Sequence, residues 1–134
     1  MTIILVVDDE PLIAMALEAA LEDAGYEVVT AANGRQGLER LAEARADLVL
    51  LDMMMPVMSG PAMLAAMAAH PELAGIPVII LSSLPEATIR DRTDGVAAII
   101  RKPYTVDQVL GEIVKALREK KPRSSSEDTP SPTA

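Results

Sequence analysis

Several residue types are absent or scarce in this chain. Its 134 residues include no cysteine, tryptophan or phenylalanine, and Tyr26 and Tyr104 are the only aromatic side chains. Without cysteine, the chain can form neither a disulfide framework nor a thiol catalyst. No apolar stretch approaches the ~20 residues needed to cross a bilayer, and the N-terminus lacks the pattern of an export signal. We therefore expect a cytoplasmic protein without membrane insertion, whose core consists of Leu, Ile, Val, Met and Ala.

Basic residues are too few to balance the acidic ones. Twelve Lys and Arg stand against 20 Asp and Glu, giving a formal net charge of -8 at pH 7. Because binding to a nucleic-acid backbone depends on clustered cations, we expect no direct contact with nucleic acid. The length suits one domain, since single domains commonly contain ~100–150 residues. The composition turns polar after Lys121, which predicts a domain over residues 1–121 and a flexible polar tail over 122–134.

Four short apolar runs each end at residues that can handle a phosphoryl group. They are ILVV before Asp8 and Asp9, LVLL before Asp52, VIIL before Ser82, and AAII before Arg101 and Lys102. In an open parallel α/β sheet, ligands bind outside the carboxyl ends of the strands, near the point where strand order reverses. The sequence therefore predicts one site that gathers three carboxylates, a hydroxyl and an ammonium.

The apolar pattern alternates between continuous runs and helical spacing, which is typical of βα units around a parallel sheet. We expect five strands, at residues 3–7, 27–30, 47–51, 78–81 and 97–100. Helices are expected from 11 to about 25, after the turn at 33–34, from 60 to 69 and from 106 to about 119. Residues 85–95 have few apolar anchors, so any helix there should be short or frayed.

Local signals predict several helix ends and buried faces. Ser59 is expected to cap one helix, and Thr105 with Gln108 forms a capping box for the last one. The sheet-facing stripe of the first helix is predicted as Leu12, Ile13, Ala16, Leu17, Ala20 and Leu21. The buried face of the last helix is predicted as Val106, Val109, Leu110, Ile113, Val114 and Leu117.

The segments VVDDEP, LVLLDMMMPVMSG, PVIILSSL and IIRKPYT resemble the four signature segments of the receiver domain of bacterial two-component response regulators. The resemblance covers roughly residues 3–119, and four such segments in order are a specific signal. It implies a flavodoxin-like, doubly wound α/β fold with five parallel strands in the order 2-1-3-4-5, here with a short or irregular fourth helix. In that order the reversal falls between strands 1 and 3, which end at Asp8-Asp9 and at Asp52.

The acidic residues predict a magnesium site. Three carboxylates at one pole raise each other's proton affinity unless a cation neutralises them. Magnesium takes oxygen ligands and often shares one or two carboxylates with a phosphate. Asp9 and Asp52 fit as direct ligands and Asp8 as a ligand through water, and the resemblance adds the backbone carbonyl of Met54.

Asp52 is the predicted nucleophile, because a carboxylate can attack a phosphoryl group to form an acyl phosphate. Catalysis of phosphoryl transfer rests mainly on positioning and electrostatic stabilisation. Lys102 is expected to direct its charge at a phosphoryl oxygen. Ser82 is expected to donate its hydroxyl to the phosphoryl group, and this contact is the proposed switch. The resemblance also implies that the peptide bond between Lys102 and Pro103 is cis.

The resemblance implies a stand-alone response regulator that takes a phosphoryl group from a histidine kinase or histidine phosphotransfer protein onto Asp52. It would signal by protein contact or phosphorelay and would turn over no external substrate. Three alternatives stay open: a phosphorylation-independent pseudo-receiver acting as a protein-interaction module, a phosphatase, and a nucleotide or flavin binder. The adjacent Asp8 and Asp9 differ from the DxD pattern of aspartyl-phosphate phosphatases. No Gly-rich loop follows the first strand, which disfavours a nucleotide binder.

Three positions depart from the family pattern. Ile99 stands where an aromatic switch residue is usual, so rotation of a Tyr or Phe is not available. Met54 and Leu84 occupy positions that influence dephosphorylation in the family, and neither can orient a water by hydrogen bonding. We therefore expect a persistent phosphoryl-aspartate. The methionines at 53, 54, 55 and 58 are expected to pack the loop over the sheet, and His70 to be a surface residue.

Overall fold

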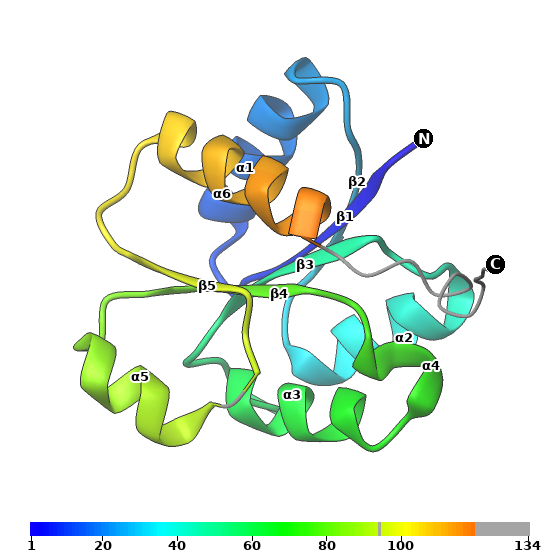
Figure 1. Ribbon diagram of the computed structural model, residues 1–134, viewed down its shortest axis with the longest axis vertical. Helices are drawn as coiled ribbons and strands as arrows, with labels where there is room; N and C mark the ends of the chain where they lie inside the picture. Colours follow the sequence, from blue (N-terminus) through cyan, green and yellow to red (C-terminus); the bar gives the residue numbers. More distant parts are fainter. Residues whose placement is uncertain (94, 120–134) are drawn as a thin grey trace, which may run out of the picture.

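The five apolar runs form one parallel sheet between two layers of helices in the computed structural model, which describes residues 1–93 and 95–119 (Figure 1). The strands are β1 (Ile3–Val7), β2 (Glu27–Ala31), β3 (Leu48–Asp52), β4 (Val78–Ser82) and β5 (Ala98–Arg101). The helices are α1 (Pro11–Asp23), α2 (Gly34–Glu43), α3 (Gly60–Ala68), α4 (Pro71–Ala74), α5 (Glu86–Arg92) and α6 (Val106–Glu119). The strand order is β2-β1-β3-β4-β5, which confirms the predicted fold class.

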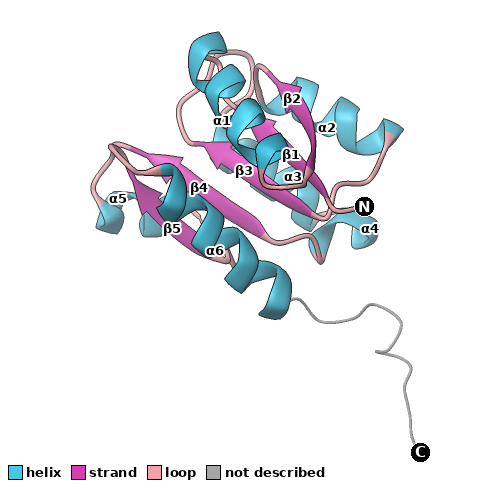
Figure 2. Cartoon of the chain, turned by 90° about the horizontal axis from the view of Figure 1, so that it is seen from above, coloured by secondary structure: helices cyan, strands magenta, loops and turns pink. Residues whose placement is uncertain are grey.

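Helices cover both faces of the sheet, with α1 and α6 on one face and α2, α3 and α5 on the other (Figures 1 and 2). Successive residues of a strand point to opposite faces. Leu5, Val49 and Ile80 therefore belong to the core under α2 and α3, whereas Ile4, Leu48 and Ile79 pack toward α1 and α6. Both faces are buried, which explains why the strands read as unbroken apolar runs.

The strand register places the polar residues at one edge. Pairing of β3 with β4 sets Asp52 opposite Leu81, and pairing of β4 with β5 sets Ser82 opposite Arg101. Strands β3, β4 and β5 each end one residue later than the sequence predicts, because these polar residues still take part in the ladder, and β3 and β5 also begin one residue later. The carboxyl ends of neighbouring strands thus lie at a common level.

The predicted caps are present. The Ser59 hydroxyl accepts a hydrogen bond from the Ala62 amide at 3.3 Å, at the start of α3. The Gln108 amide donates to Thr105 Oγ1 at 3.1 Å, and the Thr105 amide donates to Gln108 Oε1 at 2.7 Å. Helix α5 has seven residues, as short as expected. The single turn α4 was not predicted, because four residues carry too little periodicity to show in a sequence.

The predicted faces of α1 and α6 are partly wrong. On α1 the buried residues are Ala14, Leu17 and Leu21, whereas Leu12 is 79% exposed and Ala16 is exposed. Because an α-helix turns about 100° per residue, positions 12 and 16 lie nearly opposite position 14. On α6, likewise, Val106 and Val114 are exposed, and Ala116 is buried in their place.

Within the described residues, no helix combines the length and the apolar character that crossing a bilayer requires. The predicted tail over residues 122–134 and the domain boundary at 121 lie outside the described residues.

Candidate functional site

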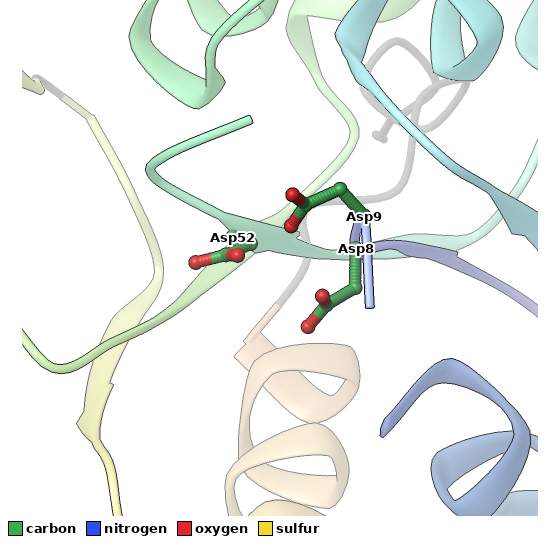
Figure 3. A group of neighbouring side chains, drawn as sticks. All are labelled: Asp8, Asp9 and Asp52. Atoms are coloured by element: carbon green, nitrogen blue, oxygen red, sulfur yellow. The ribbon is translucent and has the colours of Figure 1, made fainter. Parts of the chain in front are cut away.

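The carboxyl ends of β1 and β3 bring Asp8, Asp9 and Asp52 together (Figure 3). One carboxylate oxygen from each residue lies within 4.8 Å of those from the other two. Asp8 is 3% exposed and Asp52 is 8% exposed, whereas Asp9 is exposed. Figure 3 shows the Asp8 and Asp9 side chains leaving the end of β1 on different sides, with the Asp52 carboxylate beside them. The sequence predicted this acidic cluster, and the topology creates it.

Local backbone amides hold two of these carboxylates in place. Asp8 Oδ1 accepts a hydrogen bond from the Glu10 amide at 2.9 Å, and Asp52 Oδ1 accepts one from the Met53 amide at 2.8 Å. Asp8 Oδ2 is buried and has no hydrogen-bond partner among the residues described. Because a buried polar atom without a partner is costly and rare, it marks a place where a further ligand is needed.

Lys102 supplies the positive charge at the site. Its Nζ lies 3.9 Å from Asp8 Oδ2 and 3.8 Å from Asp52 Oδ1. The Lys102 amide donates to the Ser82 carbonyl at 2.9 Å, which fixes the chain just after β5 beside β4. The peptide bond between Lys102 and Pro103 is cis, as the family resemblance implies. One ammonium thus serves two buried carboxylates.

Burial opposes the charged forms of the two inner carboxylates more than Lys102 favours them. Burial raises the pKa of the Asp8 carboxyl above its ordinary value, more than the Glu10 amide and Lys102 lower it. Burial likewise raises the pKa of Asp52, and the charge of Asp8 adds to that rise while Lys102 opposes it. Burial and the charges of Asp8 and Asp52 also raise the pKa of the Tyr104 hydroxyl. A further cation beside these carboxylates would favour their charged forms.

These residues fit a hard divalent ion. Three carboxylates close together, one of them with a buried oxygen that accepts no hydrogen bond, match the oxygen ligands that Mg2+ prefers. Met54 follows Asp52 by two residues, and its side chain is 65% exposed. Because a thioether is a soft ligand that does not suit Mg2+, an oxygen ligand at this position would have to be the backbone carbonyl.

Ser82 is the last residue of β4 and is 2% exposed. Its hydroxyl oxygen accepts a hydrogen bond from the Leu84 amide at 3.1 Å. This bond uses an acceptor lone pair, so the hydroxyl proton remains for another partner. The side chain lies at the same sheet edge as Asp52, one strand away.

Gly60 packs against the end of β3 beside the site, a role that the sequence analysis missed because it placed residue 60 only as the start of a helix. Its amide donates to the Met53 carbonyl at 3.0 Å. A Cβ at Gly60 would collide with the Asp52 carbonyl oxygen and would come within 3.0 Å of Met53 Cα. Glycine therefore lets α3 begin directly against the end of β3. The Ser-Gly pair before a helical run was the available signal.

The methionines of the loop divide into two groups. Met53 is buried, and Met55 and Met58 pack against the core, as expected. Met54 differs, since its side chain lies largely in solvent. The loop also contains Val57 at a φ of 67°, in the left-handed region. His70 is exposed, in agreement with its prediction as a surface residue.

A family model for the response regulator receiver domain matches residues 4–114. The chain belongs to this family. The receiver domain is 35% identical over 120 residues to the transcriptional regulatory protein KdpE of Mycobacterium tuberculosis, an alignment that covers 88% of this chain and 52% of KdpE. The chain thus spans about half the length of the curated relatives it matches.

Solved receiver domains have the same fold. A CheY-like response regulator receiver domain protein from Methanospirillum hungatei superposes with a TM-score of 0.80 at 30% identity, over 90% of this chain and 96% of that one. The response regulator TrrA from Thermotoga maritima, solved in complex with Mg2+-BeF, gives a TM-score of 0.78 at 29% identity, over 87% of this chain and 99% of TrrA. This receiver domain is accordingly a signalling module of two-component systems.

Proposed function

We propose that this receiver domain accepts a phosphoryl group on Asp52 from a histidine kinase or a histidine phosphotransfer protein. Mg2+ would be held by Asp8, Asp9, Asp52 and the backbone carbonyl of Met54. One observation carries the proposal: three carboxylates lie within 4.8 Å of one another, and the buried Asp8 Oδ2 has no hydrogen-bond partner in the described chain. The complex of TrrA with Mg2+-BeF adds support from a relative.

Each residue then has a defined task. The Met53 amide and Lys102 both engage Asp52 Oδ1, which leaves Oδ2 as the attacking oxygen. Lys102 already lies between two carboxylates, so its ammonium can move to a phosphoryl oxygen as negative charge arrives. When bound, Mg2+ would supply the positive charge that lets the carboxylates and a phosphoryl group share one site.

The state of the site would be transmitted through Ser82. Its hydroxyl is held by the Leu84 amide, and donation to a phosphoryl oxygen would draw it toward Asp52. Because Ile99 cannot perform an aromatic rotation, movement of Ser82 and of the segment before the short helix α5 would form the signal. Met54 and Leu84 cannot orient a water, so the phosphoryl-aspartate should persist.

The start of α1 offers a surface for the donor protein. Leu12 is 79% exposed and Met15 is 61% exposed, and both belong to the helix that follows Asp9. A phosphohistidine must approach Asp52 closely, so its protein has to cover the rim of the acidic site. Exposed apolar side chains at that rim would contribute to such a contact.

The test is to incubate the protein with a small phosphodonor, with and without Mg2+, and to measure intact mass. We expect one added phosphoryl group, lost in Asp52→Asn and in the presence of a chelator. Asp23→Asn, at the exposed end of α1, makes the same change away from the site and should keep the adduct. An unlabelled wild-type protein would contradict the proposal. It would favour the pseudo-receiver, whose partner binding Asp52→Asn would leave unchanged.

A further inference from the structure

A cavity of about 450 Å³ lies next to the acidic site, between the loop after β3 and the end of α5. Asp9, Met54, Met55, Pro61 and Arg92 are among the residues that line it. Its walls combine methionine and proline side chains with three polar groups: the Ser59 hydroxyl, the Asp9 carboxylate of the acidic site and the Arg92 guanidinium. The proposed mechanism uses the carboxylate and assigns no task to the guanidinium.

Arg92 supplies the positive charge of the cavity lining. It is the last residue of α5, and its neighbour Arg90 already pairs with Glu86, with Nη2 2.6 Å from Oε2. The side chain of Arg92 forms no ion pair or hydrogen bond with any residue in 1–93 or 95–119. Arg92 thus lines the cavity from the C-terminal end of the short helix α5.

We propose that Arg92 and the methionine-lined cavity form a subsite for the acyl group of an acyl-phosphate donor. The receiver domain would accordingly prefer acyl phosphates to phosphoramidates as small phosphodonors. The inference rests on the proposed phosphorylation of Asp52 and specifies the donor class for that same site. Met54 and Met55 would contact the acyl carbons, since flexible thioether side chains adapt to small apolar groups.

The chemistry of the leaving group separates the two donor classes. With an acyl phosphate, a bond forms between Asp52 Oδ2 and phosphorus while the bond from phosphorus to the acyl oxygen breaks. The electron pair leaves with that oxygen as a carboxylate, and no proton is needed. With a phosphoramidate, the nitrogen departs as a neutral amine after protonation, so no anion forms beside the protein.

A guanidinium at the cavity wall therefore distinguishes the two reactions. Arg92 would attract the negative charge that grows on the acyl oxygen, and this attraction is stronger in the transition state than in the neutral-carbonyl ground state. It would give no such advantage to a departing amine. Removing the charge of Arg92 should therefore lower the rate with acyl phosphates and leave the rate with phosphoramidates unchanged.

The experiment compares Arg92→Gln with Arg90→Gln, which removes the same charge from the same helix at a residue that does not line the cavity. Phosphorylation rates with acetyl phosphate and with phosphoramidate are measured by intact mass at equal Mg2+ and ionic strength. We expect Arg92→Gln to lower the rate of phosphorylation by acetyl phosphate about fivefold relative to Arg90→Gln. One exposed cation near a growing negative charge can produce an effect of this size. The rate with phosphoramidate should stay unchanged.

Two further measurements separate a direct role from a structural one. Arg92→Lys keeps a cation and should recover most of the rate with acetyl phosphate. Added salt should shrink the difference between wild type and Arg92→Gln, because the charge is exposed. Equal losses with both donors, or an equal loss in Arg90→Gln, would overturn the subsite and leave phosphorylation of Asp52 intact. A wild-type protein labelled by neither donor would overturn both.

Discussion

The interior of the sheet buries apolar side chains, whereas its carboxyl edge buries polar ones. Along β3, four apolar residues from Leu48 to Leu51 are each 0% exposed, and the strand then ends in the buried carboxylate of Asp52. Strand β4 likewise ends in buried Ser82. Asp8 completes the set of buried polar residues in the described chain, and all three lie at the carboxyl edge. The strand pairing that buries the apolar side chains thus also positions these polar side chains, whose burial costs free energy.

This contrast separates stability from function within one sheet. Apolar burial stabilises the fold by roughly 25 cal/mol per Å². At the carboxyl edge, burial instead raises the pKa of Asp8 and Asp52, so the charged forms are held at a cost in stability. Substitutions at this edge should therefore change the free energy of unfolding differently from substitutions in the apolar interior, and some of them should raise it.

Gly60→Ala should produce the most severe loss. Its Cβ would meet the backbone of Asp52 and Met53, which cannot move without displacing the end of β3. We expect the free energy of unfolding to fall by about 3 kcal/mol, in the upper range of overpacking effects, as measured by urea denaturation. The matched control is Gly111→Ala in α6, where nothing lies within 4 Å of the added Cβ. That change should stabilise by about 1 kcal/mol through helix propensity. Equal effects of the two changes would contradict the tight packing at Gly60.

Asp52→Asn should stabilise the protein in the presence of a chelator. Removing one charge from the crowded cluster relieves its repulsion with Asp8, and the free energy of unfolding should rise by about 1 kcal/mol. The same variant should lose the stabilisation that Mg2+ gives to the wild type, since a ligand that binds only the folded state stabilises it. Asp23→Asn should change neither quantity. A destabilised Asp52→Asn in chelator would show that Lys102 already balances the site.

The apolar runs predicted the sheet because each run is long, continuous and buried on both faces. Strand order and the gathering of Asp8, Asp9 and Asp52 followed from the resemblance together with the rule on carboxyl ends. The capping pairs were also readable, because their hydrogen bonds join residues three apart in sequence. These features depend on local chemistry or on a repeated pattern.

Other features depend on contacts that no local pattern encodes. The face of α1 was misjudged because apolar residues occur all around that helix, so only packing selects Ala14 over Leu12. The need for glycine at position 60 arises from the backbone of a different element. Arg92 lines the cavity from the last residue of α5, and helix ends are the least readable part of a sequence.

The pH dependence of stability should differ between the wild type and Asp52→Asn. The pKa of Asp52 is raised in the folded state, so the folded protein binds this proton more tightly than the unfolded chain does. That contribution is present below an unfolded pKa of about 3.8 and is lost as pH rises through the raised folded pKa. In chelator, the advantage of Asp52→Asn should therefore grow from about pH 4 toward neutral pH and vanish near pH 3. Urea titrations at each pH measure it, and a constant difference would refute the assignment.

Val57→Asn should give the smallest change, because it removes backbone strain and little else. Val57 is 74% exposed and adopts a φ of 67°, where a β-branched side chain is strained and asparagine is tolerated. We expect a gain of about 0.5 kcal/mol in the free energy of unfolding. Val114→Asn is the control, since this exposed valine lies in α6, where asparagine brings no relief and a small loss in helix propensity at most. A rise in the free energy of unfolding for Val57→Asn but not for Val114→Asn would show that the loop after β3 is strained. The carboxyl edge would then carry backbone strain as well as crowded charges. Equal changes at both positions would show instead that the loop relaxes its backbone freely.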